Sequence, residues 1–139
     1  MAAVAVVLLA VSEFLPLFKI VVGSLETERE SRVGWRNNGF AMLLLGLASI
    51  PMIVGALRGA RPAMLAMAVI GIAAIVVAMT VDLPNATDEG LYGERYDDAE
   101  ARPSTGFYLE TLGGVLLLAT GGLMLLLSPR RTREERDAI

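Results

Sequence analysis

The chain has 139 residues, a formal net charge of −3, and 55% hydrophobic against 19% charged residues. A soluble domain of this size carries more charge and no long apolar runs, so a soluble globular domain and a disordered chain are both excluded. The sequence contains neither Cys nor His, which excludes disulfides, thiolate nucleophiles, structural zinc, His-ligated haem and Ser-His-Asp catalysis.

Four apolar segments cover residues 1–15, 40–57, 63–81 and 107–127. At about 1.5 Å per residue, the last three run about 27 to 32 Å, which matches the roughly 30 Å hydrocarbon core of a bilayer. A helix satisfies its own backbone polar groups inside lipid. We therefore expect an all-α membrane protein, a four-transmembrane-helix bundle that forms a single membrane domain over residues 1–139.

The first segment is the shortest, and it is interrupted by Ser12 and Glu13 before Pro16. Proline disfavours helical geometry in the residue before it, so the helix is expected to end or kink there. Two explanations stay open: a start further upstream, or a helix that continues through the kink to about Val22. A cleaved signal peptide is disfavoured because no basic stretch precedes the apolar run.

The four spans place the loops 16–39 and 82–106 on one side, and the turn 58–62 and the tail 128–139 on the other. The turn and the tail are rich in arginine close to the ends of the spans, where positive charge marks the cytoplasmic side. These arginines are Arg58, Arg61, Arg130, Arg131, Arg133 and Arg136. We expect a multi-pass protein of the cell membrane with both termini in the cytoplasm.

The first outer loop contains a β-branched and aromatic run over residues 17–22, bounded by Pro16 and Gly23, which predicts a strand. Residues 32–36 are its expected hairpin partner, and such a hairpin needs support from the second loop because an isolated one is marginal. Trp35 is expected to anchor the chain at the lipid–water interface.

The second outer loop holds seven acidic residues against two arginines. Acidic side chains can gather a hard cation or do acid–base chemistry, but this spacing matches no metal motif and singles out no pair. No metal, cofactor or catalytic residue is therefore predicted, the protein is not expected to be an enzyme, and no nucleic-acid partner is expected.

Small residues recur at helical spacing inside the predicted spans. They are Gly71, Ala74 and Ala78 in the third, and Gly113, Gly114, Gly121 and Gly122 in the fourth. Such positions let helices approach closely. They predict either internal packing of the bundle or a face that docks another membrane protein.

Three acids, Glu13, Asp82 and Glu110, fall at the outer ends of predicted spans, and Glu110 is expected in the first turn of its helix. Acids within spans are candidates for function by default. We expect interfacial ion pairs here, with the basic candidates Lys19, Arg36 and Arg102.

These features favour a non-catalytic integral membrane protein, an accessory, scaffold or envelope-interaction component whose partners are the lipid bilayer and another membrane protein or a second copy. The alternative is an oligomeric transporter. Small multidrug transporters also have four helices and an acid in the first, the place that Glu13 takes here.

The stretches 12–18 (SEFLPLF), 81–84 (VDLP), 90–93 (GLYG) and 106–113 (GFYLETLG) resemble those of small four-span membrane proteins of actinobacterial type. That resemblance covers most of the chain and implies no activity. The layout is also similar to that of claudins, which have four spans and a strand-bearing first outer loop with a Trp; the claudin disulfide is missing because the chain has no Cys. A shared layout does not transfer function.

Overall fold

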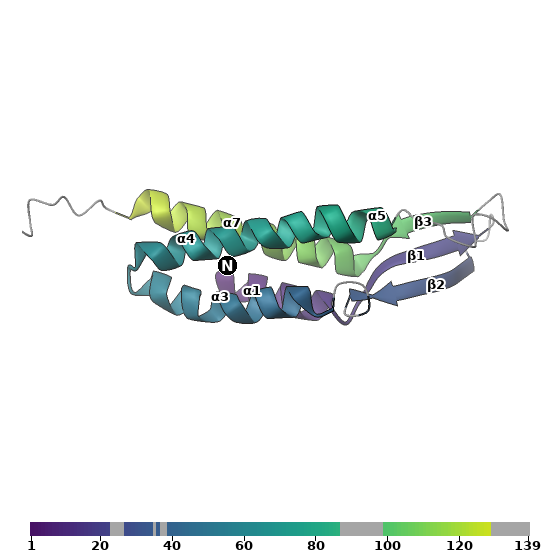
Figure 1. Ribbon diagram of the computed structural model, residues 1–139, viewed down its shortest axis with the longest axis horizontal. Helices are drawn as coiled ribbons and strands as arrows, with labels where there is room; N and C mark the ends of the chain where they lie inside the picture. The colour runs from purple at the N-terminus through teal and green to yellow at the C-terminus, as the bar shows by residue number, and fades with distance from the viewer. Residues whose placement is uncertain (23–26, 35, 37–38, 87–98, 129–139) are drawn as a thin grey trace, which may run out of the picture.

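The computed structural model describes all residues except 23–26, 35, 37–38, 87–98 and 129–139. The described part is mostly helical, with a small sheet at one end (Figure 1). The helices are α1 (Ala2–Ser12), α3 (Ala41–Leu57), α4 (Arg61–Val77), the π-helical turn η1 (Ala78–Asp82), α5 (Leu83–Ala86) and α7 (Thr105–Leu127). The strands are β1 (Pro16–Val22), β2 (Thr27–Val33) and β3 (Ala99–Pro103).

The four longer helices pack side by side in the cyclic order α1, α3, α4, α7, and α4 with α7 forms the most extensive of these contacts. Figure 1 shows them lying nearly along one long axis, with the strands continuing that axis past one end of the bundle. The molecule therefore has a sheet end and an opposite end, where the turn between α3 and α4 lies.

Glycines bring α4 and α7 into backbone contact. A methyl group at Gly71 would overlap the backbone nitrogen of Leu118, and one at Gly121 would lie 2.7 Å from the nitrogen of Ala68. One at Gly114 would lie 2.9 Å from Cγ1 of Ile75. This close approach explains why α4 and α7 form the tightest helix pair of the bundle.

The outward faces of all four helices are apolar. Large hydrophobic side chains are exposed on α1 (Val4, Val7, Val11), α3 (Leu44, Leu47, Ile50, Val54), α4 (Leu65, Val69, Ile72, Val76) and α7 (Leu112, Val115, Leu123, Leu126). Among the described residues, two helices are long and apolar enough to cross a membrane. They are Arg61–Asp82, with a mean hydropathy of 2.7, and Thr105–Leu127, with 1.8.

The sheet is antiparallel with the strand order β2-β1-β3, so β1 is its central strand. Leu17, Phe18 and Ile20 of β1 are buried. The expected partner at residues 32–36 is wrong in position, because β1 pairs with β2 over Thr27–Val33. On its other edge β1 pairs with β3, which the second loop supplies.

Two helix boundaries differ from the expected ones because of proline. The chain turns into β1 at Pro16, so the alternative of a first helix that continues to Val22 is wrong. At the other proline, α4 begins at Arg61 rather than after Pro62, because proline fits the first turn of a helix, where its missing N–H is not needed. The turn is therefore shorter than residues 58–62.

Candidate functional site

The three acids that the sequence singles out lie together at the sheet end of the bundle. Glu13 directly follows α1, Asp82 ends η1, and Glu110 lies in α7. Each is at most 1% exposed. Asp82 acts electrostatically on both glutamates, and Glu13 acts on Glu110. We call these three residues the carboxyl cluster.

Glu13 caps a neighbouring helix. Its Oε1 accepts hydrogen bonds from the backbone N–H groups of Met42, at 2.8 Å, and Leu43, at 3.1 Å. The N-cap residue of α3, Phe40, has a left-handed backbone (φ 67°) and makes no side-chain cap of its own. The first backbone N–H groups of a helix have no hydrogen-bond acceptor within the helix. The carboxylate of Glu13, at the end of α1, supplies this acceptor for α3, and its negative charge interacts favourably with the positive end of the α3 dipole.

A glycine makes room for this cap. A methyl group at Gly34 would lie 2.9 Å from Cα of Glu13 and 3.1 Å from its Oε2. The Gly34 N–H also donates to the carbonyl of Leu15 at 3.3 Å. The chain that follows β2 is thus packed directly onto the capping residue, and only glycine fits there without a shift.

Glu110 makes a side-chain hydrogen bond with Asp82. The other oxygen of Glu110, Oε1, is buried and has no hydrogen-bond partner. One acceptor position of Glu110 is therefore unused.

The location of Glu110 corrects one expectation. Because α7 begins at Thr105, Glu110 lies in the second turn and not in the first, beyond the unpaired N–H groups that would favour its charge. The expected basic partner Arg102 pairs instead with Glu100, with 2.7 Å between the guanidinium nitrogen and the carboxylate oxygen, and both side chains are exposed. That guanidinium holds the pKa of Glu100 below its usual value.

The described residues contain no group of three acids spaced to hold a metal ion. The hydrogen bonds of Glu13 join the end of α1 to the start of α3, and the contact of Glu110 with Asp82 joins α7 to η1. The described chemistry of the cluster is hydrogen bonding.

The predicted small residues mostly face other helices of the same chain. A methyl group at Gly113 would lie 2.9 Å from Cγ of Leu9 in α1. Ala74 and Ala78 are fully buried, and Gly71, Gly114 and Gly121 line the α4–α7 contact described above. Gly122 differs, because a methyl group there would meet nothing within 4 Å. The expected anchor Trp35 and most of the acidic loop lie outside the described residues.

Sequence reasoning missed two glycines at the sheet end, Gly34 and Gly106. A methyl group at Gly106 would lie 2.8 Å from the carbonyl oxygen of Pro16, so the start of α7 sits on the start of β1. The Ser104 N–H donates to the carbonyl of Leu17 at 2.7 Å and fixes the same contact. A glycine next to a predicted helix start is a signal for such an approach, but it does not say which segment approaches.

No family model, no curated protein and no solved structure matches the chain.

Proposed function

We propose that this chain is a non-catalytic integral membrane protein whose four helices cross the bilayer and whose two outer loops form a small extracytoplasmic cap. In this proposal the protein is an accessory or scaffold component that packs against other membrane proteins. The absence of His and Cys from the whole sequence supports the non-catalytic part of the proposal.

The observation that carries the proposal is the apolar outward surface of α1 and α3 as well as of α4 and α7. Monomeric soluble proteins rarely expose apolar patches larger than a few hundred Å². Only 33% of the most apolar stretch of Arg61–Asp82 and 28% of that of Thr105–Leu127 is buried, whereas the core helix of a soluble protein is mostly buried. A lipid environment on all sides accounts for this surface.

The ends of the bundle support an orientation. The turn between α3 and α4 carries the exposed Arg58 and Arg61, α7 ends at the same end of the bundle, and the sequence after α7 is rich in arginine. Positive charge favours the cytoplasmic side. The sheet, built from both long loops, then lies outside the cell.

Single-cysteine labelling tests this proposal, because the native chain offers no background thiol. Glu100→Cys and Arg58→Cys place a thiol at two exposed sites at opposite ends of the molecule. We expect a membrane-impermeant maleimide to label Glu100→Cys in intact cells and Arg58→Cys only after permeabilisation. The reverse pattern contradicts the orientation, and a monodisperse protein in buffer without any amphiphile contradicts the membrane location.

The accessory role is tested by co-purification in mild detergent, followed by mass spectrometry. We expect a stoichiometric membrane partner. Gly122 on the outward face of α7 is the first position to probe, because a bulky side chain there disturbs no described contact within the chain. A partner retained by the wild type and lost from Gly122→Leu places the docking face on α7.

The buried carboxyl cluster is the reason to test a second candidate function, proton-coupled transport by an oligomer that uses Glu13. Loss of cationic-dye export in Glu13→Gln, with unchanged expression, would support transport. A chain without any dye export, purified with a stoichiometric partner, leaves the accessory role.

A further inference from the structure

Three exposed aromatic residues lie where the helices meet the sheet, and each belongs to a different helix. Phe14 lies two residues after the end of α1, Phe40 is the N-cap residue of α3, and Tyr108 lies near the start of α7. They are 63%, 40% and 61% exposed, respectively. We call these three residues the aromatic rim.

The helix cap described above puts two members of the rim at one level along the bundle axis. Glu13, which directly precedes Phe14, accepts a hydrogen bond from the backbone N–H of Met42 at 2.8 Å. Met42 lies two residues after Phe40 in the chain. Phe14 and Phe40 are therefore level to within a few ångströms.

The third member of the rim is fixed at the same level by the contact of α7 with the start of the sheet. A methyl group at Gly106, two residues before Tyr108, would lie 3.0 Å from the carbonyl oxygen of Leu15, which directly follows Phe14. Two residues of a helix rise about 3 Å. The three aromatic residues therefore lie within about one helical turn of one another along the axis.

The exposed apolar surface of the bundle ends at the aromatic rim. Among the residues whose exposure is described, no large hydrophobic residue is exposed in 15–21, 82–84 or 100–107, which lie towards the sheet. On η1, which continues α4, the last exposed large hydrophobic residue is Val81. The exposed Glu100 and Arg102 of β3 are charged. The surface thus changes from apolar to polar over a short distance.

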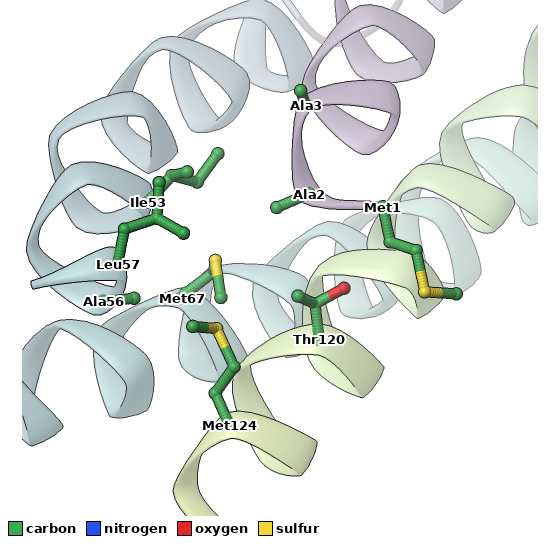
Figure 2. A pocket seen from close by; sticks show the side chains of 9 residues that line it. All are labelled: Met1, Ala2, Ala3, Ile53, Ala56, Leu57, Met67, Thr120 and Met124. Carbon is green, nitrogen blue, oxygen red and sulfur yellow. The ribbon is translucent and has the colours of Figure 1, made fainter. Parts of the chain in front are cut away.

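The other edge of this apolar surface lies beside a cavity between the helices, at the end of the bundle opposite the sheet (Figure 2). Leu57, which lines the cavity, and Leu127 are both largely exposed there, and the exposed Arg58 follows Leu57. At about 1.5 Å per residue, the stretch from Tyr108 to Leu127 is about 29 Å long, and that from Phe40 to Leu57 about 26 Å. Both lengths are close to the roughly 30 Å of a bilayer's hydrocarbon core.

The aromatic rim extends around more than one side of the bundle. In the bundle α1 lies between α3 and α7, which contact each other only slightly. A protein docked on one helix face would not reach all three residues, whereas a membrane surface surrounds the bundle. Aromatic rings are enriched at membrane–water interfaces, and a tyrosine there keeps its ring in apolar surroundings and its hydroxyl in contact with water.

We propose that the aromatic rim lies at the outer boundary of the hydrocarbon core and that its side chains contact the lipid headgroup region. The inference rests on the membrane location proposed above and adds the depth at which the bundle sits. The carboxyl cluster lies at nearly the same level, because Glu13 precedes Phe14 and Glu110 follows Tyr108 by two residues. The acids are then at the edge of the bilayer and not at its centre, where a charged side chain is most costly.

The test measures the depth of each rim position by tryptophan fluorescence. Trp35 is the only tryptophan of the chain, so Trp35→Phe supplies a background without tryptophan emission. In that background Phe14→Trp, Phe40→Trp and Tyr108→Trp each report one position in phosphatidylcholine vesicles whose lipids carry bromine, a quencher, at defined acyl-chain depths. We expect all three tryptophans at about 15 Å from the bilayer centre, which is half the thickness of the hydrocarbon core.

Two further variants in the same background are the controls. Val115, an exposed residue of α7, lies seven residues after Tyr108, so Val115→Trp is expected about 10 Å deeper. Glu100→Trp on β3 is expected to escape quenching by every brominated lipid and to be quenched by iodide in the water. Circular dichroism checks that each variant keeps its helices, and because the three rim positions are measured separately, one misfolded variant leaves two tests.

Rim tryptophans that differ in depth by more than one helical turn, about 5 Å, overturn the proposal, as do rim tryptophans as deep as Val115→Trp. Rim tryptophans that no brominated lipid quenches, next to a quenched Val115→Trp, overturn it too. All of these results leave the membrane location intact. A Val115→Trp that no brominated lipid quenches contradicts the membrane location itself, and with it the depth assigned to the rim.

Discussion

The two ends of the bundle are built on different principles. At the sheet end, directed polar contacts fix the positions of the chain segments: Glu13 caps α3, Glu110 bonds to Asp82, and Ser104 is tied to Leu17. At the opposite end, apolar and flexible side chains surround a cavity, and the nearby charges are exposed. The comparison teaches that a small bundle can hold one end with directed polar contacts and leave unfilled apolar space at the other.

The contact between α4 and α7 runs through both regions, and breaking it gives the largest expected effect. Gly121→Leu would force a side chain into the backbone of Ala68, so we expect a loss of about 3 kcal/mol or more in the free energy of unfolding. The measurement is thermal unfolding in detergent.

The adjacent glycine supplies the control for that experiment. Gly122→Leu is expected to unfold within about 1 kcal/mol of the wild type, because a side chain there meets open space and leucine favours the helix more than glycine does. Equal destabilisation by both leucines would show that the α4–α7 contact is assigned to the wrong face.

Removing the helix cap that Glu13 provides at the sheet end is expected to have a smaller effect on the free energy of unfolding. Glu13→Ala leaves the N–H groups of Met42 and Leu43 without their acceptor, which should cost about 1 to 2 kcal/mol. Glu13→Gln keeps a side-chain oxygen at that place and should recover part of the loss. Thermal unfolding of both variants checks this, and an equal loss in the two would contradict the capping role.

A larger side chain at the end opposite the sheet should cost little stability, because the cavity there leaves space for it. This result would sharpen the difference between the two ends. Thr120→Leu removes a hydroxyl that bonds only within its own helix and adds apolar volume to the cavity. We expect the free energy of unfolding to change by less than about 1 kcal/mol, with the direction towards stability. A loss of more than 2 kcal/mol, which marks overpacking, would show that this end is as tightly packed as the other.

The smallest effect concerns the exposed pair on β3. Arg102→Gln should return the pKa of Glu100 to its ordinary range, because the guanidinium that lowers it is gone. The contribution of the pair to stability is present above the unfolded-state pKa of Glu100 and is lost as the pH falls through its lower folded-state pKa. A carboxyl NMR titration measures the shift, and no change in the melting temperature at neutral pH is expected.

The sequence predicts the helical character well, because long apolar runs without central charges leave few alternatives in lipid. It also places the three acids near helix ends. It does not predict that Glu13 accepts from Met42 and Leu43, because no local pattern says which helix start a carboxylate reaches. Residues 99–103 contain no β-branched or aromatic residue, and β3 forms there because the edge of β1 offers backbone partners.

The central position of β1 has a consequence for biosynthesis. Pro16–Val22 is synthesised before its second neighbour, Ala99–Pro103, and the helices α3 and α4 are made between the two strands. Until then one edge of β1 is unpaired, and Gly106 cannot yet close over Pro16. A nascent chain is therefore exposed to strand-mediated aggregation throughout this interval, and completion of the sheet coincides with arrival of the last helix.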